Sequence, residues 1–463
     1  PTVILTDTDD DNILAASDTV TITAAFDEAM TSTPTISISG TSISNQVMTK
    51  IIGGSGSGPD SQLGADIDGE ALNDNSGYSV SLSSDGSRVA IGASGNDGNG
   101  TLSGHVRIYD YNGSAWVQVG DDIDGEAAND YSGWSVSLSP DGSRVAIGAY
   151  GNDGAQYSNK TDSGHVRIYE YSSGSWNQLG DDIDGEAAND NSGYSVSLSS
   201  DGSRVAIGAS GNDANGTNSG HVRIFQYYLQ YDQWISVGNI PGEAANDMSG
   251  SSVSLSSDGS RVAIGASGND ANGTNSGHVR VYQYSSGVTW NQVGDDIDGE
   301  APYDTSGYSV SISSDGSRVA IGAPSNSGNG VYSGHVRVYE YSSGSWTQVG
   351  ADIDGNTASD YNYSGRSVSI SSDGSRVAIG AFGNIPNGTL TGQTRVYEYS
   401  SGSWTQVGVD IDGEAENDRS GHSVSLSSDG SRVAIGAYGN DGNGTNSGHV
   451  RVYEYSSGSW TQV

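Results

Sequence analysis

The residues of this sequence best spaced for chemistry are the carboxylates of a recurring stretch that reads "DIDGEAAND" in one copy. Asp122, Asp124, Glu126 and Asp130 stand at positions i, i+2, i+4 and i+8, and Gly125 allows a sharp turn between them. Calcium takes about six to eight oxygen ligands, so an oxygen-rich loop of this kind suits it. The alternative is that these side chains accept hydrogen bonds from nearby backbone amides.

The same spacing recurs in four other copies, which widens the set of candidate ligands. The candidate calcium ligands are Asp66, Asp68, Glu70 and Asp74; Asp122, Asp124, Glu126 and Asp130; Asp182, Asp184, Glu186 and Asp190; Asp296, Asp298, Glu300 and Asp304; and Asp410, Asp412, Glu414 and Asp418. Two further copies depart from the pattern: one reads "NIPGEAAND", and another carries Asn356 in place of the glutamate. Calcium is the only cofactor that the sequence predicts, and both interpretations of the loops stay open.

Asn-x-Ser/Thr tripeptides mark a second set of candidate sites, for glycosylation. They occur at Asn99, Asn112, Asn159, Asn215, Asn272, Asn362, Asn387 and Asn443, five of them in the same "NGT" loop. In a eukaryotic secretory pathway we expect these loops to carry glycans. In a bacterium they are ordinary Asn-Gly turns.

The histidines, arginines and tryptophans follow the repeat and therefore indicate structure rather than catalysis. Six of the seven histidines stand in "GHVR", fourteen of the sixteen arginines occupy two repeat positions, and only His422 is an unrepeated histidine. We expect the repeated arginines to pair with nearby carboxylates, and the repeated tryptophans to pack on outer strands. A sugar-stacking role for the tryptophans would require exposed rings on one rim.

Seven copies of the phrase "SDGSRVAIGA", with "PDGSRVAIGA" in the second, determine the expected architecture. The Asp of each copy falls at Asp85, Asp141, Asp201, Asp258, Asp315, Asp373 and Asp429, 56 to 60 residues apart. Within the copy that covers 122–180, four segments alternate apolar and small or polar residues as strands do, and a Pro-Asp-Gly-Ser turn joins the first two. Each unit is thus predicted to be a four-stranded antiparallel sheet, and the fold class to be all-β.

One such sheet cannot fold by itself, because ordering about 57 residues costs on the order of 1–2 kcal/mol each and few large apolar side chains are present to compensate. Both faces of each sheet therefore need a neighbour. Seven twisted sheets satisfy this need by closing into a ring, which also removes bare terminal faces. The sequence predicts a seven-bladed β-propeller of four-stranded antiparallel blades over 62–463.

The composition narrows the set of partners and places the protein outside the cell. Acidic residues number 56 against 18 basic ones, so the net charge of −38 excludes nucleic acid and anionic membranes as partners. High salt or bound cations would screen the self-repulsion. The chain contains no cysteine, no run of about 18–20 apolar residues and no signal peptide, which fits a mature or excised extracellular segment.

Residues 1–49 lie outside the repeat and precede a Gly/Ser-rich linker over 50–61. Alternating segments such as "TVTITAAF" and "PTISISG" resemble part of a bacterial-type Ig-like β-sandwich, which needs about 100 residues. We expect this incomplete segment to pack on the propeller or to be completed by strands of another chain, as in a homopolymer. The alternative is that the chain is a fragment of a longer protein.

The repeat resembles a known family. "SGYSV", "VAIGA" and "SGHVRIY" are similar to the motifs of the FG-GAP repeat of integrin-α-like propellers, in its bacterial or algal variant. The resemblance implies an extracellular adhesion or surface-display propeller, usually without catalysis. Calcium-binding members of the family carry an acidic loop between the first two strands, where this sequence has only "SSDGSR". The family's calcium ligands therefore cannot be transferred by position.

These observations favour a non-catalytic extracellular structural or adhesion protein, not an enzyme, that presents a calcium- or salt-stabilised propeller to protein or glycan partners at the cell surface or in a filament. The alternative is a propeller enzyme, a polysaccharide lyase or hydrolase, that acts at the central channel. A cluster of unlike polar residues on one rim would distinguish the enzyme. Partner contacts are expected at two Tyr-rich irregular stretches, 225–234 and 360–367.

Overall fold

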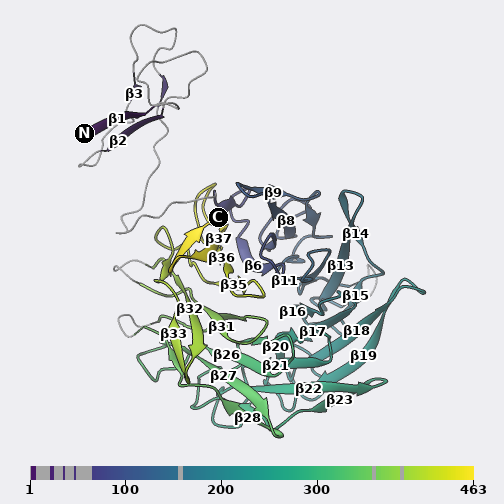
Figure 1. Cartoon of the computed structure of the whole chain (residues 1–463). Coiled ribbons are helices and arrows are strands. Elements are labelled where there is room, and N and C mark those ends of the chain that lie inside the picture. Colours follow the sequence, from purple (N-terminus) through teal and green to yellow (C-terminus); the bar gives the residue numbers. More distant parts are fainter. Residues whose placement is uncertain are drawn as a thin grey trace. The chain divides into compact units, whose positions relative to one another are not determined.

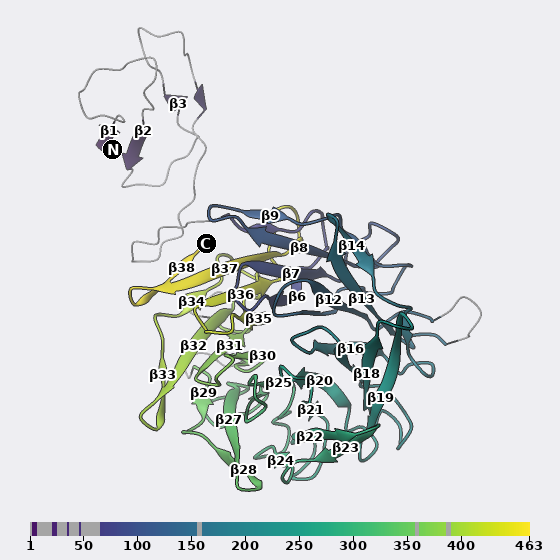
Figure 2. The same cartoon turned by 45° about the vertical axis from the view of Figure 1, so that its right-hand side comes forward.

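The computed structural model describes residues 2–6, 21–25, 35–36, 46–47, 65–154, 160–356, 361–385 and 390–463. Every regular element among them is a β-strand. The chain divides into two compact units, Pro1–Pro59 and Asp60–Val463. The second unit is built of seven antiparallel sheets that follow one another around a ring (Figures 1 and 2).

Each sheet contributes four strands in sequence order, numbered here from the ring axis outward, since the first strands of successive sheets contact one another. The inner strands are β6 (Ser76–Leu82), β11 (Ser135–Leu138), β16 (Ser192–Leu198), β20 (Ser249–Leu255), β25 (Ser309–Ile312), β30 (Ser367–Ile370) and β35 (Ser423–Leu426). The second strands are β7 (Arg88–Ala93), β12 (Arg144–Ala149), β17 (Arg204–Ala209), β21 (Arg261–Ala266), β26 (Arg318–Ala323), β31 (Arg376–Ala381) and β36 (Arg432–Ala437).

Two further strands form the outer half of each blade. The third strands are β8 (His105–Tyr111), β13 (His165–Ser172), β18 (His221–Tyr228), β22 (His278–Ser286), β27 (His335–Ser342), β32 (Gln393–Ser400) and β37 (His449–Ser456). The fourth strands are β9 (Trp116–Gln118), β14 (Ser175–Gln178), β19 (Gln233–Pro241), β23 (Thr289–Gln292), β28 (Ser345–Gln348), β33 (Ser403–Gln406) and β38 (Ser459–Gln462). The predicted all-β, seven-bladed propeller of four-stranded blades is confirmed.

A two-residue strand, which the sequence did not predict, adds to most blades. These strands are β5 (Ile67–Asp68), β10 (Ile123–Asp124), β15 (Ile183–Asp184), β24 (Ile297–Asp298), β29 (Ile353–Asp354) and β34 (Ile411–Asp412), and each pairs with the third strand of the preceding blade. In blade three the long strand β19 takes both places, because "GNIPG" is one residue shorter than "GDDIDG". The carboxylate-rich stretch thus begins as the edge of one blade and then crosses to the next.

The hydrophobic core consists of layers between successive blades. Val145 and Ile147 of β12 pack on blade one, whereas Ala146 between them packs on blade three, as the alternation predicted. The layer between blades seven and one has the same composition, with Val89 and Ile91 packed against Val450 and other residues of blade seven. Every blade therefore buries both faces.

Polar contacts close the ring between its first and last blades. β5 pairs with β37 of blade seven, and the Ser428 backbone N–H donates to the Ser84 carbonyl at 2.8 Å. The Trp116 indole N–H donates to the Val463 carbonyl at 2.8 Å, and each repeated tryptophan makes the same bond to its preceding blade. The tryptophans are therefore interblade packing residues.

The glycine of "VAIGA" is required by close approach between inner strands. A Cβ at Gly92 would lie 2.0 Å from the carbonyl oxygen of Gly133 in the next blade, and the same holds at the equivalent glycines. The Ser79 hydroxyl donates to that carbonyl at 2.8 Å. Small residues at these positions let the blades meet around the axis.

In the first unit, β1 (Thr2–Thr6) pairs antiparallel with β2 (Thr21–Ala25), and β3 (Thr35–Ile36) pairs with β4 (Gln46–Val47). The rest of the predicted Ig-like segment and most of the linker over 50–61 lie outside the described residues. The Ig-like assignment, the homopolymer and the domain boundaries at 49 and 61 stay predictions.

Gly322→Ala is expected to lower the free energy of unfolding by about 1–3 kcal/mol, because its Cβ would lie 2.1 Å from the Gly365 carbonyl and backbone cannot move aside cheaply. Urea unfolding followed by tryptophan fluorescence measures this. Ser345→Ala, on the exposed outer strand β28, is the matched control. Equal stability of the two variants would contradict the role of this close approach.

Candidate functional site

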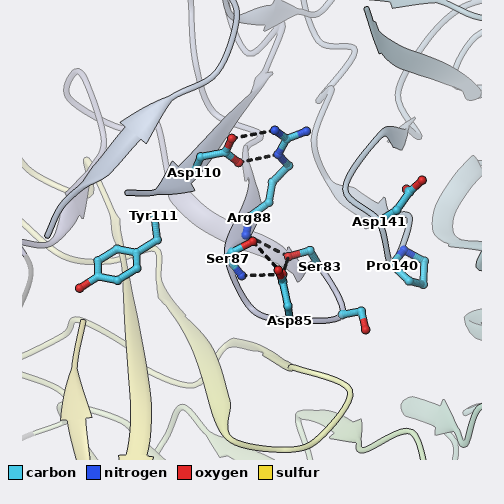
Figure 3. Close-up of a pocket in the computed structure, with 9 residues that line it drawn as sticks. Ser83, Asp85, Ser87, Arg88, Asp110, Tyr111, Pro140 and Asp141 are labelled. Atoms are coloured by element: carbon cyan, nitrogen blue, oxygen red, sulfur yellow. Dashed lines mark hydrogen bonds and ion pairs between the residues drawn. The ribbon is translucent and has the colours of Figure 1, made fainter. Parts of the chain in front are cut away.

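The propeller has two different ends. At the turn end, tight turns join the first and second strands of each blade, and an open depression of about 370 Å³ lies there beside Ser83, Asp85, Arg88, Asp110 and Asp141 (Figure 3). Arg88 donates to both carboxylate oxygens of Asp110, at 2.5 and 2.7 Å. An equivalent arginine–carboxylate pair, or an arginine–glutamine pair, recurs in the other blades, as expected from the sequence.

The carboxylates of the turn aspartates accept hydrogen bonds from residues of their own turns. Asp85 accepts hydrogen bonds from the Ser83 hydroxyl and from the backbone N–H and hydroxyl of Ser87. Burial opposes ionisation, but these hydrogen bonds outweigh it and lower the pKa of Asp85. Because the same arrangement recurs in every blade, this end has a structural role.

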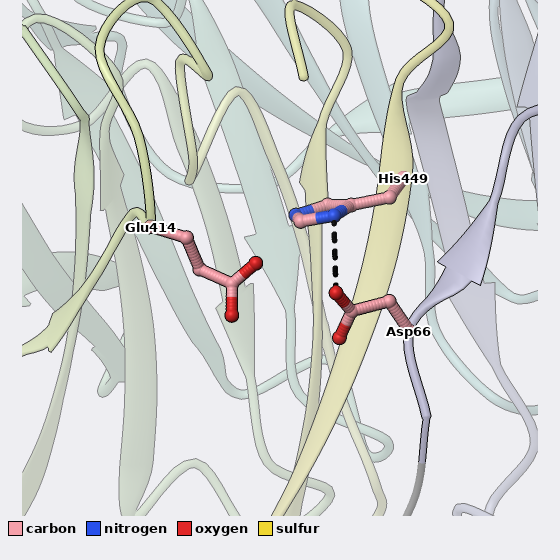
Figure 4. A group of neighbouring side chains, drawn as sticks. All are labelled: Asp66, Glu414 and His449. Carbon is pink, nitrogen blue, oxygen red and sulfur yellow. Dashed lines mark ion pairs between the residues drawn. The ribbon is translucent and has the colours of Figure 1, made fainter. Parts of the chain in front are cut away.

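At the opposite, crossover end, a histidine at the start of the third strand faces carboxylates in every blade except blade six. Figure 4 shows the junction of Asp66, Glu414 and His449, in which His449 Nδ1 lies 3.6 Å from Asp66 Oδ2. Four other junctions repeat it: Glu70, His105 and Asp122; Glu126, His165 and Asp182; Glu243, His278 and Asp296; Glu300, His335 and Asp352. Burial, followed by the neighbouring arginine, lowers the pKa of His105 to about 4, so this histidine is neutral at pH 7.

The structure separates the carboxylates that the sequence placed in one calcium loop. Asp122 faces His105 and Glu126 faces His165, so the two ends of one crossover belong to different junctions. Asp124 lies on β10 with an exposed side chain, and Asp130 is buried and accepts from the Ala127 backbone N–H.

The same four positions recur in the other crossovers. At the first position, a histidine faces Asp66, Asp182 and Asp296, and Gln393 donates to Asp410. At the second position, the two-residue strands contain Asp68, Asp184, Asp298 and Asp412, and at the third position an arginine of the next blade faces Glu70, Glu186, Glu300 and Glu414. The fourth position is a buried turn residue: Asp74, Asp190, Asp304 or Asp418. Among the described residues, no close group of three ligands contains two carboxylates of one crossover.

Blade six provides a natural comparison for these junctions. There Gln393 replaces the histidine and Asn356 replaces the glutamate, so two of the three groups change together in one junction. Gln393 Nε2 donates directly to Asp410 and Asp412, at 2.9 and 2.8 Å. In the intact junctions the imidazole nitrogen lies 3.6–4.0 Å from the carboxylate oxygens, beyond hydrogen-bonding distance. One nitrogen and two oxygen ligands suit zinc or manganese better than calcium, which prefers oxygen alone.

A different group of side chains gathers at the ring axis on the crossover end. The residue after each Ser-Gly at the head of an inner strand is Tyr78, Trp134, Tyr194, Ser251, Tyr308, Arg366 or His422, which we call the axial cluster. The Tyr78 ring lies 4.4 Å from Trp134 of blade two and 4.6 Å from His422 of blade seven. Arg366 of blade six also interacts with Tyr78 of blade one and Tyr194 of blade three, which are not its neighbouring blades, so these side chains point to the axis.

Arg366 and His422 form the polar centre of the axial cluster. Arg366 Nη2 lies 2.8 Å from His422 Nε2, and His422 Nδ1 lies 3.2 Å from the Tyr78 carbonyl oxygen. The neutral tautomer that satisfies both contacts carries its proton on Nδ1 and accepts from Arg366 at Nε2. The guanidinium also lies over the Tyr308 ring, 4.4 Å from its centroid.

The electrostatics of this centre differ from the rest of the acidic propeller. Burial, followed by the charge of Arg366, holds the pKa of His422 well below its usual range, and burial lowers the pKa of Arg366. Arg366 and Arg419 are the two arginines outside the repeat positions, and neither forms an ion pair with a described carboxylate.

The axial cluster is the feature that sequence reasoning missed. His422, the two unrepeated arginines and the stretch 360–367 each stood out in the sequence, but their proximity did not. The signal was present at the position after Ser-Gly, which differs from blade to blade within an otherwise constant motif.

The glycosylation candidates fall into four groups. Asn99, Asn215, Asn272 and Asn443 donate their amide N–H groups to carbonyls of the adjacent crossover, and Asn329, which is not in a sequon, does the same. Asn362 is fully buried, whereas Asn112 is exposed. Asn159 and Asn387 lie outside the described residues, and glycosylation stays a prediction.

Comparison with known proteins agrees with the fold. The FG-GAP repeat family matches residues 123–169, 183–225, 241–282 and 409–453, so the chain is a seven-bladed β-propeller that contains FG-GAP repeats in four places, as its resemblance predicted. A search of curated proteins finds no match. The described part of the chain contains no helix with the length and hydrophobicity that a bilayer crossing requires.

Three solved structures share the fold at low identity. The first is a protein proposed to be a 6-phosphogluconolactonase from Bacteroides uniformis, with 12% identity, a TM-score of 0.55 and coverage of 81% of this chain and 95% of that chain. The second is the periplasmic gluconolactonase of Pseudomonas aeruginosa, with 16% identity, a TM-score of 0.50 and coverage of 77% of this chain and 91% of that chain. The third is a protein from Lactobacillus plantarum, with 13% identity, a TM-score of 0.54 and coverage of 81% of this chain and 95% of that chain.

These neighbours contradict the prediction that the protein is not an enzyme. That prediction rested on the argument that identical repeats spread identical groups around a ring and leave no site of unlike groups. Two of the three neighbouring propellers are named as lactonases, so the architecture does not exclude catalysis. The axial cluster also supplies the unlike groups whose absence the argument assumed.

Divalent cations are expected to bind the five intact junctions and to raise the melting temperature, because binding to the folded state alone stabilises it. Metal analysis after dialysis against Zn²⁺, Mn²⁺ or Ca²⁺ measures the stoichiometry. The double variant His105→Gln with Glu70→Asn, which copies the natural pair of blade six, is expected to bind one ion fewer. A melting temperature indifferent to a chelator, with no bound ion, would contradict the prediction.

Proposed function

We propose that this protein is a hydrolase that acts on an acidic carbohydrate, or its lactone, at the axial cluster. The observation that carries the proposal is the convergence of unlike groups, with Arg366 and His422 in contact and aromatic rings around them, in a chain whose other histidines and most other arginines follow the repeat. The lactonase names of two structural neighbours support the class of reaction.

The roles of the residues follow from their surroundings. Tyr78, Trp134 and Tyr194 are partly exposed and offer aromatic faces to the C–H faces of a sugar ring. Arg366, which has no described carboxylate partner, can hold a substrate carboxylate or stabilise charge that develops on a carbonyl oxygen. When Arg366 turns to the substrate, His422 Nε2 becomes free to accept a proton from an attacking water.

The proposal includes a location outside the cell. The acidity of the chain and its FG-GAP repeats support an extracellular setting in which salt screens the net charge of −38. The irregular hairpin of blade three, with exposed Leu229 and Tyr231, supports a separate protein contact there.

His422→Gln and Arg366→Gln are each expected to lower kcat/KM at least about 100-fold, the usual contribution of a positioned base or charged donor. The assay is proton release from a panel of aldonolactones and release of new reducing ends from a panel of uronic-acid oligosaccharides. The control is His105→Gln, which repeats the natural Gln393 and lies outside the axial cluster.

The pH dependence follows from the lowered pKa of His422. Because its pKa is lowered, His422 stays neutral as the pH falls through about 6.5, the ordinary pKa of histidine, so the activity that depends on it is expected to persist through this pH. Loss of activity with a midpoint near 6.5, or equal activity of all three variants, would contradict the assignment of His422.

A further inference from the structure

A continuous row of aromatic side chains runs through the axial cluster, and Tyr194 and Tyr438 branch from it. The row starts at Tyr131 and Tyr150 of blade two, whose rings stack 5.3 Å apart, and Tyr150 lies 4.5 Å from Trp134. It continues through Tyr78 to His422, and from there to Phe382 at 6.0 Å. The row thus crosses the ring axis from blade two to blade six.

On the far side the row reaches the surface. Tyr363 stacks on Phe382, with centroids 5.2 Å apart and planes 15° apart, and Tyr332 stacks on Tyr363 at 5.8 Å and 13°. Tyr361 lies 5.5 Å from Tyr332. Tyr361 is 51% exposed and Tyr332 36%, so the row ends on open surface.

Packing alone does not explain the outer tyrosines, because their backbones are strained. Tyr332, Tyr361 and Tyr363 have φ angles of 49°, 66° and 55°, in the left-handed region that β-carbon sterics disfavour. The equivalent positions of blade seven and its crossover are Asn446, Asn417 and Arg419, and asparagine is the commonest residue at these positions around the ring. Asparagine tolerates this conformation, whereas three neighbouring tyrosines retain it at a cost in stability.

The row also breaks the symmetry of the ring. The side of the axis formed by blade four has Ser251, Ser267 and Met248 at the positions where the row has aromatic residues. Tyr194 and Tyr308 add rings from blades three and five, so the rings are spread unevenly around the axis. The continuous row through blades two, one, seven and six fits an elongated ligand that lies across the crossover end.

We infer that the partly or fully exposed rings of this row, Tyr131, Tyr150, Trp134, Tyr78, Phe382, Tyr363, Tyr332 and Tyr361, bind consecutive sugar units of an acidic oligosaccharide, one unit of which lies at Arg366. The inference rests on the proposed function and specifies its substrate as a chain rather than a single sugar. Tilted and stacked rings in sequence provide faces for successive pyranose units, and tyrosine adds hydroxyl groups at the ring edges. Arg366 lies over the Phe382 ring of the row, and Arg419 lies over the Tyr438 ring beside His422, so both can supply the positive charge that an acidic unit requires.

Chain length is the variable that tests the inference. Affinity, measured by calorimetry, is expected to rise at least tenfold from galacturonic acid to its hexamer. Sulfated and neutral hexamers form parallel arms, which distinguish a carboxylate from a sulfate and from an uncharged unit at Arg366. Equal affinity for the monomer and all hexamers would overturn the inference.

The variants are chosen so that folding does not confuse the result. Tyr361→Asn and Tyr332→Asn introduce the residue that tolerates the left-handed backbone, so thermal stability is expected to hold or rise. Affinity for the hexamer is expected to fall at least fivefold, with affinity for the monomer unchanged. Tyr303→Asn is the matched control, since Tyr303 has the same backbone (φ 68°) and is 58% exposed but makes no ring contact among the described residues.

The outcomes separate this inference from the proposed function. Length-dependent binding without turnover would retain the inference and reject the hydrolase. Turnover that requires Arg366 but does not depend on chain length would retain the hydrolase and reject the inference. A fall in stability of Tyr361→Asn with unchanged affinity for the hexamer would show that the row is structural and would overturn the inference.

Discussion

The approach of neighbouring inner strands around the axis is the constraint on which the structure depends. Gly92 of one blade faces the Gly133 carbonyl of the next with no room for a Cβ, and Ser79 bonds to the same carbonyl. This approach brings the valine and isoleucine side chains of each blade onto the next, so that seven sheets that are unstable alone share seven apolar layers. Closure at Ser84 and Ser428 gives the first and last blades the same surroundings as the others.

The repeat provides the close strand approach and the apolar layers in every blade. The few positions that contribute to neither can therefore vary from blade to blade. The residue after each Ser-Gly points to the axis and does not contribute to the layers between blades. Tyrosine, tryptophan, serine, arginine and histidine all occur there, in different blades. The repeated blades therefore form a rigid scaffold, and the chemically distinct groups are the side chains that follow each Ser-Gly, whose identity the repeat does not fix.

The acidic residues divide into two classes with opposite responses to acid. The turn aspartates, such as Asp85, have lowered pKa values, so they stabilise the fold above their unfolded pKa and lose that contribution as the pH falls through the folded value. Burial raises the pKa values of crossover carboxylates such as Glu70 and Asp124. This effect of burial is larger than the opposing effect of the neighbouring arginine, which lowers the same pKa values. Their burial disfavours the folded state at neutral pH, and protonation relieves this. Cations or salt would relieve the mutual repulsion of these groups at neutral pH without any change in protonation.

The amino-acid pattern alone predicts the seven units, the four main strands of each, their buried faces and the turns between them. These features arise from local alternation and from turn residues such as Asp141-Gly142, which act within a few positions of the chain. Ring closure also followed, because no single sheet could bury both faces.

Only the tertiary structure decided which residues share a site. Asp122 and Glu126 are four positions apart, yet they serve different junctions, because the chain leaves one blade and enters the next between them. Conversely, Tyr78 and His422 meet although most of the propeller separates them in sequence, because closure brings blade seven beside blade one. Local spacing predicts strands and turns well. It cannot predict a site whose members are brought together by a ring of seven blades.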